Sequence, residues 1–273
     1  MKMSENNNKS TTKLFDRFNR DDYDTVIELG FDEAGRGCFF GPIMAGAVLW
    51  PLQETWGQEL SVLAGKIKDS KKLSPSRRSE YAKCIRNLIE IWGVGIVHAD
   101  EINEYGIQWA NREAFRRALT GAWQKINPSV KNSTHNFRMV VDGAISFKDL
   151  VGSVLGSEKN CTEELIVEGD SKYLSIAAAS ILAKVEHDDW IEGWIEKNPE
   201  NAVRYDMPGS KGYGTAKHRD GLGKWGALIG HRTLFVRNWV PGRNETVVIK
   251  NSKPSASYSS KKRDYDNVCF IKL

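Results

Sequence analysis

Long hydrophobic runs are missing from this sequence of 273 residues. No apolar stretch approaches the ~20 residues with which a helix crosses a bilayer. Residues 1–13 are polar and rich in Asn, with no apolar stretch after their lysines, which argues against a secretory signal peptide. We therefore expect an intracellular, cytoplasmic protein that does not interact with a membrane.

Cysteine is scarce, and none of the four cysteines is spaced for metal or redox chemistry. They are Cys38, Cys84, Cys161 and Cys269. The chain has no C-x-x-C pair, so neither a zinc site nor a disulfide-exchange motif is indicated. In a chain without a secretory signal, four scattered cysteines are expected to be reduced thiols.

The middle of the chain has no net positive charge. The formal net charge is +4, but residues 1–20 carry +3 and residues 241–273 carry +4, which leaves −3 for residues 21–240. Any nucleic-acid site in the folded part must therefore be a local patch. We expect a flexible leader over residues 1–20, one folded domain over 21–242 and a flexible basic tail over 243–273.

Alternating strand and helix patterns fill the interval between the two tails. Strands are predicted at residues 25–31, 43–49, 95–99, 137–141 and 165–167, and helices at 76–92, 107–126 and 175–190, the last continued or followed by another over 189–197. This alternation predicts an α/β layer structure. The helical C-terminal third predicts a small appended lobe from about residue 190.

Four acidic residues lie at predicted strand ends: Asp32, Glu33, Asp142 and Asp170. Strand ends at one edge of an α/β sheet commonly bind ligands. Carboxylates brought together there repel one another unless a cation compensates them, and hard oxygen ligands suit Mg²⁺ or Mn²⁺. Two such ions about 4 Å apart can clamp a phosphodiester. Spacing alone also allows the alternative of separate surface acids at turns and helix caps.

Five short motifs surround these acids. They are GFDEAGRG at residues 30–37, DSKKLS at 69–74 with Arg77-Arg78, VDG at 141–143, GDS at 169–171 with SIAAASILAKV at 175–185, and GYGT at 212–215 with His218 and His231-Arg232. In sequence and in order they resemble the type 2 ribonucleases H, the family of ribonuclease HII and the eukaryotic ribonuclease H2 catalytic subunit. A single motif would be weak support, but five in family order over about residues 25–240 are specific.

The resemblance implies a ribonuclease H-like catalytic domain over residues 21–242, with a mixed central sheet flanked by helices and a small, mainly helical C-terminal lobe. It implies cleavage of the RNA strand of RNA–DNA hybrids, and cleavage 5′ to ribonucleotides embedded in duplex DNA, leaving a 3′-hydroxyl and a 5′-phosphate. Hybrids and ribonucleotide-containing duplex DNA are therefore the expected binding partners. We expect a monomer, and accessory proteins are left open.

The resemblance also assigns roles to individual residues. Two Mg²⁺ or Mn²⁺ ions would be held by the catalytic acids Asp32, Glu33, Asp142 and Asp170, and substrate would be bound by Gly35, Arg36, Gly37, Lys71, Lys72, Lys184 and Tyr213. These roles are chemically sensible, because glycine lets the backbone approach a sugar closely and an arginine supplies a fork for phosphate. A tyrosine near the 2′-hydroxyl could help to confine cleavage to ribonucleotides.

Some residues of the motifs have simpler interpretations. The basic segment 66–78 could neutralise duplex phosphates, or it could be a solvated helix start. We interpret His218 and His231 as turn or helix-cap residues rather than catalysts. The Ala-rich centre of residues 175–185 is interpreted as packing a helix against the sheet, with a functional part limited to placing Asp170 and to Lys184.

The chain departs from the family pattern in two places, and two other functions stay open. Cys38-Phe39-Phe40 replaces a small or Pro-containing segment, and the interval from Asp142 to Asp170 is longer than in compact bacterial members. We expect residues 147–164 to form a surface loop or helix. The alternatives are another nuclease of the ribonuclease H-like fold that cuts branched DNA, and a non-catalytic hybrid-binding subunit.

Overall fold

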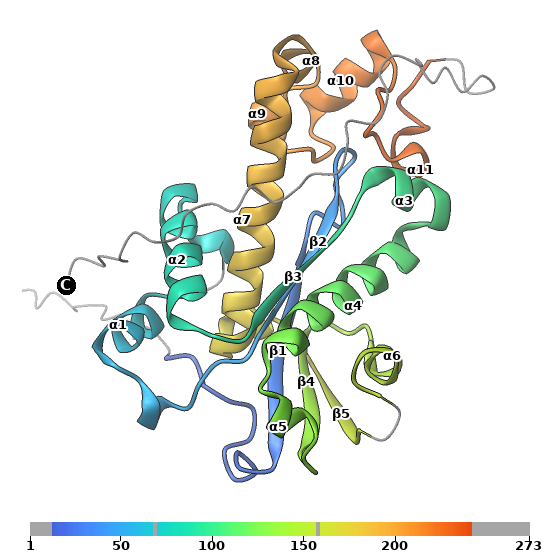
Figure 1. The fold of residues 1–273 in the computed structure, drawn as a ribbon. Helices are drawn as coiled ribbons and strands as arrows, with labels where there is room; N and C mark the ends of the chain where they lie inside the picture. Colours follow the sequence, from blue (N-terminus) through green and yellow to red (C-terminus); the bar gives the residue numbers. More distant parts are fainter. Residues whose placement is uncertain (1–12, 68–69, 157–158, 242–273) are drawn as a thin grey trace, which may run out of the picture.

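The computed structural model describes residues 13–67, 70–156 and 159–241, apart from the side chain of Lys71. Its five strands form one mixed sheet in the order β3-β2-β1-β4-β5 (Figure 1). The strands are β1 Val26–Ala34, β2 Ile43–Val48, β3 Trp92–Val97, β4 Asn136–Asp142 and β5 Cys161–Ile166. β2 pairs antiparallel with β1 and β3, whereas β1, β4 and β5 run parallel. The expected mixed sheet is confirmed.

Helices cover both faces of the sheet. α4 (Ile107–Lys125) packs on one face, and α7 (Leu174–Lys197) packs on the other beside α2 (Pro75–Leu88) (Figure 1). α7 approaches the sheet so closely that a Cβ atom on Gly46 would lie 2.2 Å from the carbonyl oxygen of Ala179. The Ala-rich part of α7 is buried, so the interpretation of this segment as helix packing is confirmed.

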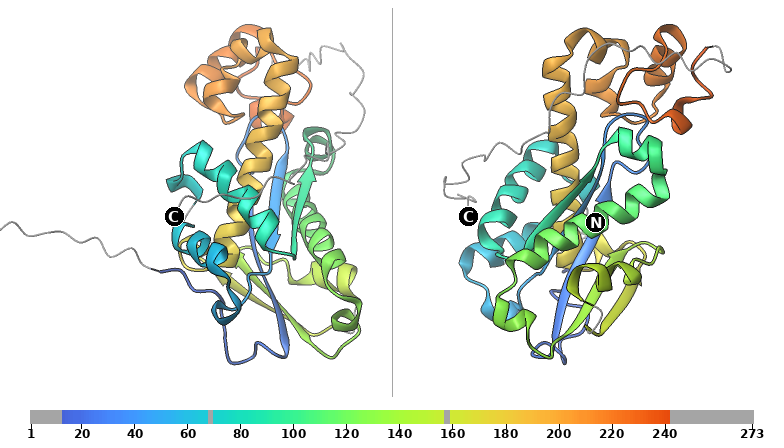
Figure 2. Two further views of the ribbon diagram at one scale, coloured as in Figure 1. Left: turned by 60° about the vertical axis from the view of Figure 1, so that its left-hand side comes forward. Right: turned by 45° about the vertical axis from the view of Figure 1, so that its right-hand side comes forward.

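The remaining helices are short. They are η1 Gln53–Thr55, α1 Gln58–Lys66, η2 Ser70–Lys72, α3 Ala99–Tyr105, α5 Pro128–Lys131, η3 Lys148–Leu150, α6 Val151–Leu155, η4 Gly169–Ser171, α8 Pro199–Arg204, α9 Met207–Ser210, α10 Ala216–Trp225 and α11 Thr233–Val236. α8 to α11 gather around the far end of α7 and form a helical lobe with its own apolar core. Figure 2 shows this lobe beyond one end of the sheet.

Several predicted boundaries are wrong. β1 runs to Ala34 rather than ending at Phe31, so Asp32 and Glu33 lie inside this strand and do not follow it. α2 begins as expected, with the Ser74 hydroxyl accepting from the backbone N–H of Arg77, but it ends at Leu88 rather than at Trp92. Trp92 instead begins β3, in which alternate residues are buried. The expected loop or helix over residues 147–164 contains η3 and α6, but β5 already begins at Cys161. β5 lies at the sheet edge and is only half-buried, so its pattern in the sequence is weak.

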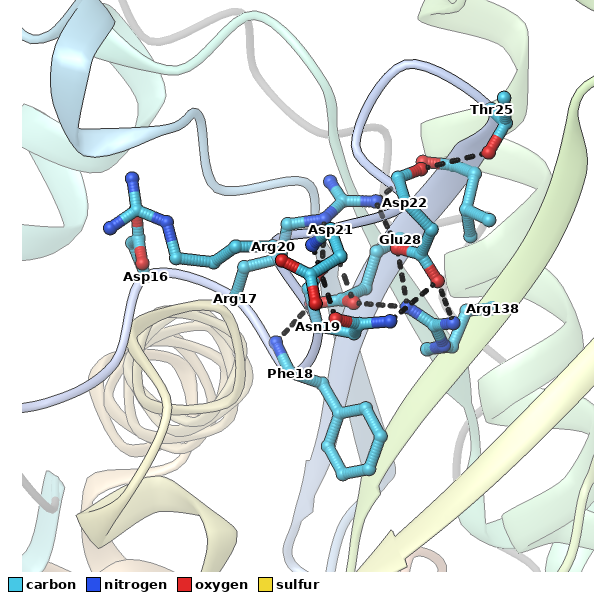
Figure 3. Close-up of polar contacts among 11 residues, drawn as sticks. Asp16, Arg17, Phe18, Asn19, Arg20, Asp21, Asp22, Thr25, Glu28 and Arg138 are labelled. Atoms are coloured by element: carbon cyan, nitrogen blue, oxygen red, sulfur yellow. Dashed lines mark hydrogen bonds and ion pairs between the residues drawn. The ribbon is translucent and has the colours of Figure 1, made fainter.

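Residues 13–20 belong to the folded structure, although we expected them to continue a flexible leader; residues 1–12 lie outside the described residues. Arg17 and Asp16 are buried. Figure 3 shows Arg138 of β4 reaching Asp22 and Glu28, and Glu28 also accepts from the backbone N–H of Phe18 at 2.8 Å. This network fastens the N-terminal segment to β1 and β4.

Two of the four cysteines can be compared with the expectation of reduced thiols. Cys38 and Cys161 are free thiols. Cys269 lies outside the described residues. Among the helices of the described part, none is long and apolar enough to cross a membrane.

Candidate active site

Two of the predicted metal-binding acids lie on neighbouring strands. Phe31 of β1 pairs with Val141 of the parallel strand β4, so Asp32 and Asp142 follow at the same level and on the same face. Asp32 is buried, and burial raises its pKa well above the ordinary value. The charges of Asp142 and Glu33 raise that pKa further. A cation beside this pair would relieve both costs.

The hydroxyl of Ser180 on α7 hydrogen-bonds the carboxylate of Asp32 and partly offsets the rise in its pKa. Ser180 lies 2.9 Å from the hydroxyl of Ser70 in η2. Because the Ser180 hydroxyl donates its proton to Asp32, it can only accept from the Ser70 hydroxyl. The serine of the 69–74 motif thus supports an acid of the first motif, which sequence spacing did not predict.

Glu33 follows Asp32 in β1 and lines a small cavity of about 90 Å³, together with Asp142, Arg36 and Asn111. Arg36 lies 3.8 Å from the carboxylate of Glu33, and its side chain is 42% exposed. The cavity therefore combines two acidic groups with a guanidinium that solvent, or a phosphate, can reach.

Asp170 lies in the turn η4. The backbone N–H of Gly169 donates to Oδ1 of Asp142 at 2.7 Å, and Asp170 itself is buried. The chain reaches this turn through Glu168, whose φ of 56° is left-handed. Asp142 is thus the central acid, because it neighbours Asp32 across the sheet, shares a cavity with Glu33 and contacts the turn that carries Asp170.

A divalent cation suits this donor set, although the four acids do not yet form a closed cage. Among residues 13–67, 70–156 and 159–241, no three Asp, Glu, His or Cys side chains lie close enough together to hold a metal ion. Mg²⁺ usually needs only one or two carboxylates, with waters and substrate phosphates as its other ligands. The Asp32–Asp142 pair meets that requirement, while the meeting of all four acids stays a prediction.

The glycine–arginine–glycine turn lies next to Tyr213. Gly35 has a φ of +79°, and a Cβ there would lie 2.4 Å from the ring of His187. The hydroxyl of Tyr213 hydrogen-bonds the backbone of Gly35 and the thiol of Cys38, and burial raises its pKa. Gly37 faces open space within the described structure. The structure therefore brings Gly35 and Tyr213 into contact, while their role in binding substrate stays a prediction.

The predicted basic contacts have different surroundings. Lys184 lies 5.4 Å above the ring of Tyr213, and its ammonium bonds Asp188 at 2.8 Å. Lys72 is exposed in η2, while the side chain of Lys71 lies outside the described part. Arg78, which we counted in the basic segment, is buried and donates to the carbonyl groups of Ser70 and Leu73. It supports the η2 turn.

The comparison with known proteins decides the family. The model of the family described as Ribonuclease HII matches residues 29–239. The chain belongs to the ribonuclease HII family. As a ribonuclease HII, it is a metal-dependent endoribonuclease that acts on RNA–DNA hybrids. The fold, the motifs and this match agree.

Relatives of known identity cover most of the chain. The ribonuclease HII of Synechocystis sp. is 36% identical over 213 residues, which are 76% of this chain and 95% of the relative. The solved ribonuclease H2 of Pyrococcus horikoshii is 26% identical with a TM-score of 0.58, and covers 78% of this chain and 96% of its own. The ribonuclease HII solved in a PCNA complex from Archaeoglobus fulgidus is 27% identical with a TM-score of 0.56, over 81% of this chain and 98% of its own.

One residue of this ribonuclease HII site was missed by the sequence reasoning. Arg232 is fully buried, and its guanidinium donates to the carbonyl oxygens of Arg36 at 2.9 Å and Gly41 at 3.0 Å. It therefore fixes both ends of the segment that follows Gly35. The His231-Arg232 pair was noted as a motif, but only the fold reveals its partner, which lies almost two hundred residues earlier.

Proposed function

We propose that this chain hydrolyses the RNA strand of hybrids and cuts 5′ to single ribonucleotides in duplex DNA by a two-metal mechanism, leaving a 3′-hydroxyl and a 5′-phosphate. The observation that carries the proposal is the pair of carboxylates on Asp32 and Asp142, which lie on the adjacent parallel strands β1 and β4, next to their last paired residues. A turn that offers open backbone at Gly37 belongs to the same strand hairpin.

In this proposal Asp32, Glu33, Asp142 and Asp170 hold two Mg²⁺ or Mn²⁺ ions. When bound, such ions activate the attacking water and stabilise the leaving oxygen. The protein contributes the arrangement of these acids: Ser180 orients Asp32, and the backbone of Gly169 orients Asp142. Arg36, partly exposed beside Glu33, supplies a guanidinium to the phosphate.

Selection for the ribonucleotide belongs to the 35–37 turn and Tyr213. The backbone of Gly35, Arg36 and Gly37 would face the ribose, since the open side of Gly37 leaves room for a sugar. The ring of Tyr213, 37% exposed, would pack near the 2′-hydroxyl, the group that distinguishes RNA from DNA. Lys71, Lys72 and Lys184 would neutralise duplex phosphates, which makes binding depend on salt.

The test is one cleavage assay with three end-labelled duplexes: DNA with a single ribonucleotide, a full hybrid, and plain DNA. With Mg²⁺ or Mn²⁺ we expect cutting of the first two, 5′ to the ribonucleotide in the first, and no cutting with EDTA. Asp142→Asn should lose at least about a hundredfold in rate, because it removes the central acid. Asp149→Asn, an exposed acid paired with Arg112, is the matched control and should stay active.

Three results would contradict the proposal. Full activity of Asp142→Asn would remove the metal-binding role of the acids. Cleavage of branched all-DNA substrates without an effect of ribonucleotides would favour the DNA nuclease alternative. Tight hybrid binding without cleavage would favour the non-catalytic subunit.

A further inference from the structure

The helical lobe buries two histidines in direct contact. His218 and His231 are 0% and 2% exposed, and their Nε2 atoms lie 3.0 Å apart. The rings of Phe40 and Tyr205 pack against His231 at centroid distances of 5.0 and 4.9 Å. Two imidazolium ions could not share this apolar site. Burial to this degree opposes even a single charged ring, so we take the pair as neutral, with one proton between the two Nε2 atoms.

The surroundings fix where each proton lies. Nδ1 of His218 lies 3.0 Å from the carbonyl oxygen of Tyr213, which can only accept, so His218 carries its proton on Nδ1. Its Nε2 then accepts, and Nε2 of His231 donates. Nδ1 of His231 is left as the acceptor for the backbone N–H of Leu228 at 2.9 Å. One directed chain of hydrogen bonds thus runs from Leu228 to Tyr213.

The opposite arrangement is disfavoured at both ends. The carbonyl of Leu228 also lies 3.2 Å from Nδ1 of His231, so a proton there is conceivable. That proton would meet the N–H of Leu228, and His218 would then present a lone pair to the carbonyl of Tyr213. Two repulsive contacts would replace two hydrogen bonds.

The two histidines are connected to the segment that follows the 35–37 turn. Cys38 forms a β-bridge with Tyr213, and Phe40 forms one with His231. The segment between Gly37 and Gly41 is therefore bridged at Cys38 to the Tyr213 backbone and at Phe40 to the His231 backbone. The hydrogen bonds of the Tyr213 hydroxyl with Gly35 and Cys38 therefore depend on the position of the Tyr213 backbone.

We propose that His218 and His231 are positioning residues, whose directed hydrogen bonds hold Tyr213 in place for selecting the ribonucleotide. The inference rests on the proposed function of Tyr213 and adds a role to the turn or helix-cap interpretation of the two histidines. Neither ring is assigned contact with substrate. Each acts through the backbone carbonyl of Tyr213.

Electrostatics support the neutral pair. Burial lowers the pKa of both rings, and burial together with the neighbouring His218 lowers that of His231 to about 3. Asp206 at the start of α9 acts in the opposite direction on His218. Arg232 directs its guanidinium to Arg36 and Gly41 rather than to the pair. Because Nδ1 of His231 is the one lone pair open to a further proton in this chain of bonds, protonation would displace the N–H of Leu228.

The proton arrangement can be measured without any catalytic assay. The protein has five histidines, and ¹⁵N chemical shifts of imidazole rings distinguish the two neutral tautomers and the cation. At pH 7 we expect the Nδ1–H tautomer for His218 and the Nε2–H tautomer for His231. The reverse tautomers, or a charged ring at either position, would overturn the inference.

A matched pair of substitutions tests the link to Tyr213. In His218→Asn the side-chain amide can still donate to the Tyr213 carbonyl but no longer reaches His231, whereas His218→Gln reaches His231 and loses Tyr213. Both variants lose one buried hydrogen bond, so their melting temperatures should fall by similar amounts. On a duplex with one ribonucleotide, kcat should be about tenfold lower for Gln than for Asn, with KM unchanged. Equal kcat values would overturn the inference.

Two controls separate this inference from the proposed function. In a Tyr213→Ala background, the difference between the two His218 variants should vanish, and a persisting difference would contradict an action through Tyr213. The NMR signals of the Tyr213 ring should shift in His218→Gln and not in His218→Asn. If the wild type cuts no ribonucleotide-containing duplex, the proposed function fails, while unchanged ring signals in His218→Gln would refute the positioning role itself.

Discussion

At the scale of single residues, the two glycines around Arg36 are required for different reasons. Gly35 has a left-handed φ and no room for a Cβ beside His187, so the fold itself demands glycine. Gly37 has an ordinary φ and faces open space, so the described structure does not require glycine there. The sequence motif could not distinguish these cases, because both positions appear in it as the same letter.

Alanine substitutions should separate the two glycines. Gly35→Ala is expected to destabilise the protein by about 2 kcal/mol, from the strained φ and the contact with His187. Gly37→Ala should leave stability within about 0.5 kcal/mol, while kcat/KM on a single-ribonucleotide duplex falls at least about tenfold. Urea unfolding and cleavage kinetics check both values. Normal cleavage by Gly37→Ala would contradict the contact of this backbone with the sugar.

The buried carboxylate of Asp32 should lower the stability of the protein when no metal is bound. Its pKa in the folded protein is raised by burial and by Asp142 and Glu33, so without metal the folded state becomes less stable as the pH rises above the ordinary Asp value. In EDTA at pH 7 we therefore expect Asp32→Asn to melt at a higher temperature than the wild type. Added Mg²⁺ should raise the melting temperature of the wild type only. A variant that melts lower in EDTA would contradict this account.

At the scale of elements, burial decided which segments were predictable. α4 and α7 have long apolar patterns and were predicted within a few residues, whereas the edge strand β5 was predicted too short. The N-terminal segment was misjudged for another reason. Its fixation depends on Arg17, Glu28 and Arg138, charged residues whose meeting across β1 and β4 leaves no local pattern.

Removing the guanidinium of Arg138 from that network should lower the free energy of unfolding. Arg138→Met leaves the buried carboxylate of Glu28 and its neighbour Asp22 with less compensation, and we expect a loss of about 3 kcal/mol in the free energy of unfolding. Arg112→Met, which removes an exposed pair with Asp149, should cost less than about 1 kcal/mol. Urea denaturation measures both variants. Equal losses would show that the network is not a fastening point.

At the scale of the whole molecule, the parts of the site that the sequence predicted are those that lie in contiguous motifs. The acids, the 35–37 turn and Tyr213 belong to this group, because the resemblance named them, and their roles stay predictions. Arg232 and the pairing of His218 with His231 required the fold, since a hydrogen bond to a backbone carbonyl has no signature in the sequence of either partner.

The buried histidines should make the whole protein sensitive to acid. The pKa of His231 in the folded state is about 3, below the ordinary value of 6.5. The unfolded chain therefore binds the extra proton as the pH falls below 6.5, and stability decreases. This residue alone should cost about 1.4 kcal/mol per pH unit between those two values. Urea unfolding from pH 7 to 4.5 should show a shallower loss for His231→Gln, and parallel curves would contradict the assignment.

The β-bridges at Cys38 and Phe40 limit where homologous enzymes can be joined into chimeras. Phe40 belongs by sequence to the N-terminal hairpin, but its ring lies in the core of the lobe built by α8 to α11. A chimera that joins the sheet of one parent to the lobe of another must therefore transplant residues 35–42 with the lobe. For a crossover placed only between α7 and α8, we expect the acids to be inherited intact, while the lobe no longer fits Phe40 and the proposed selection for ribose is lost.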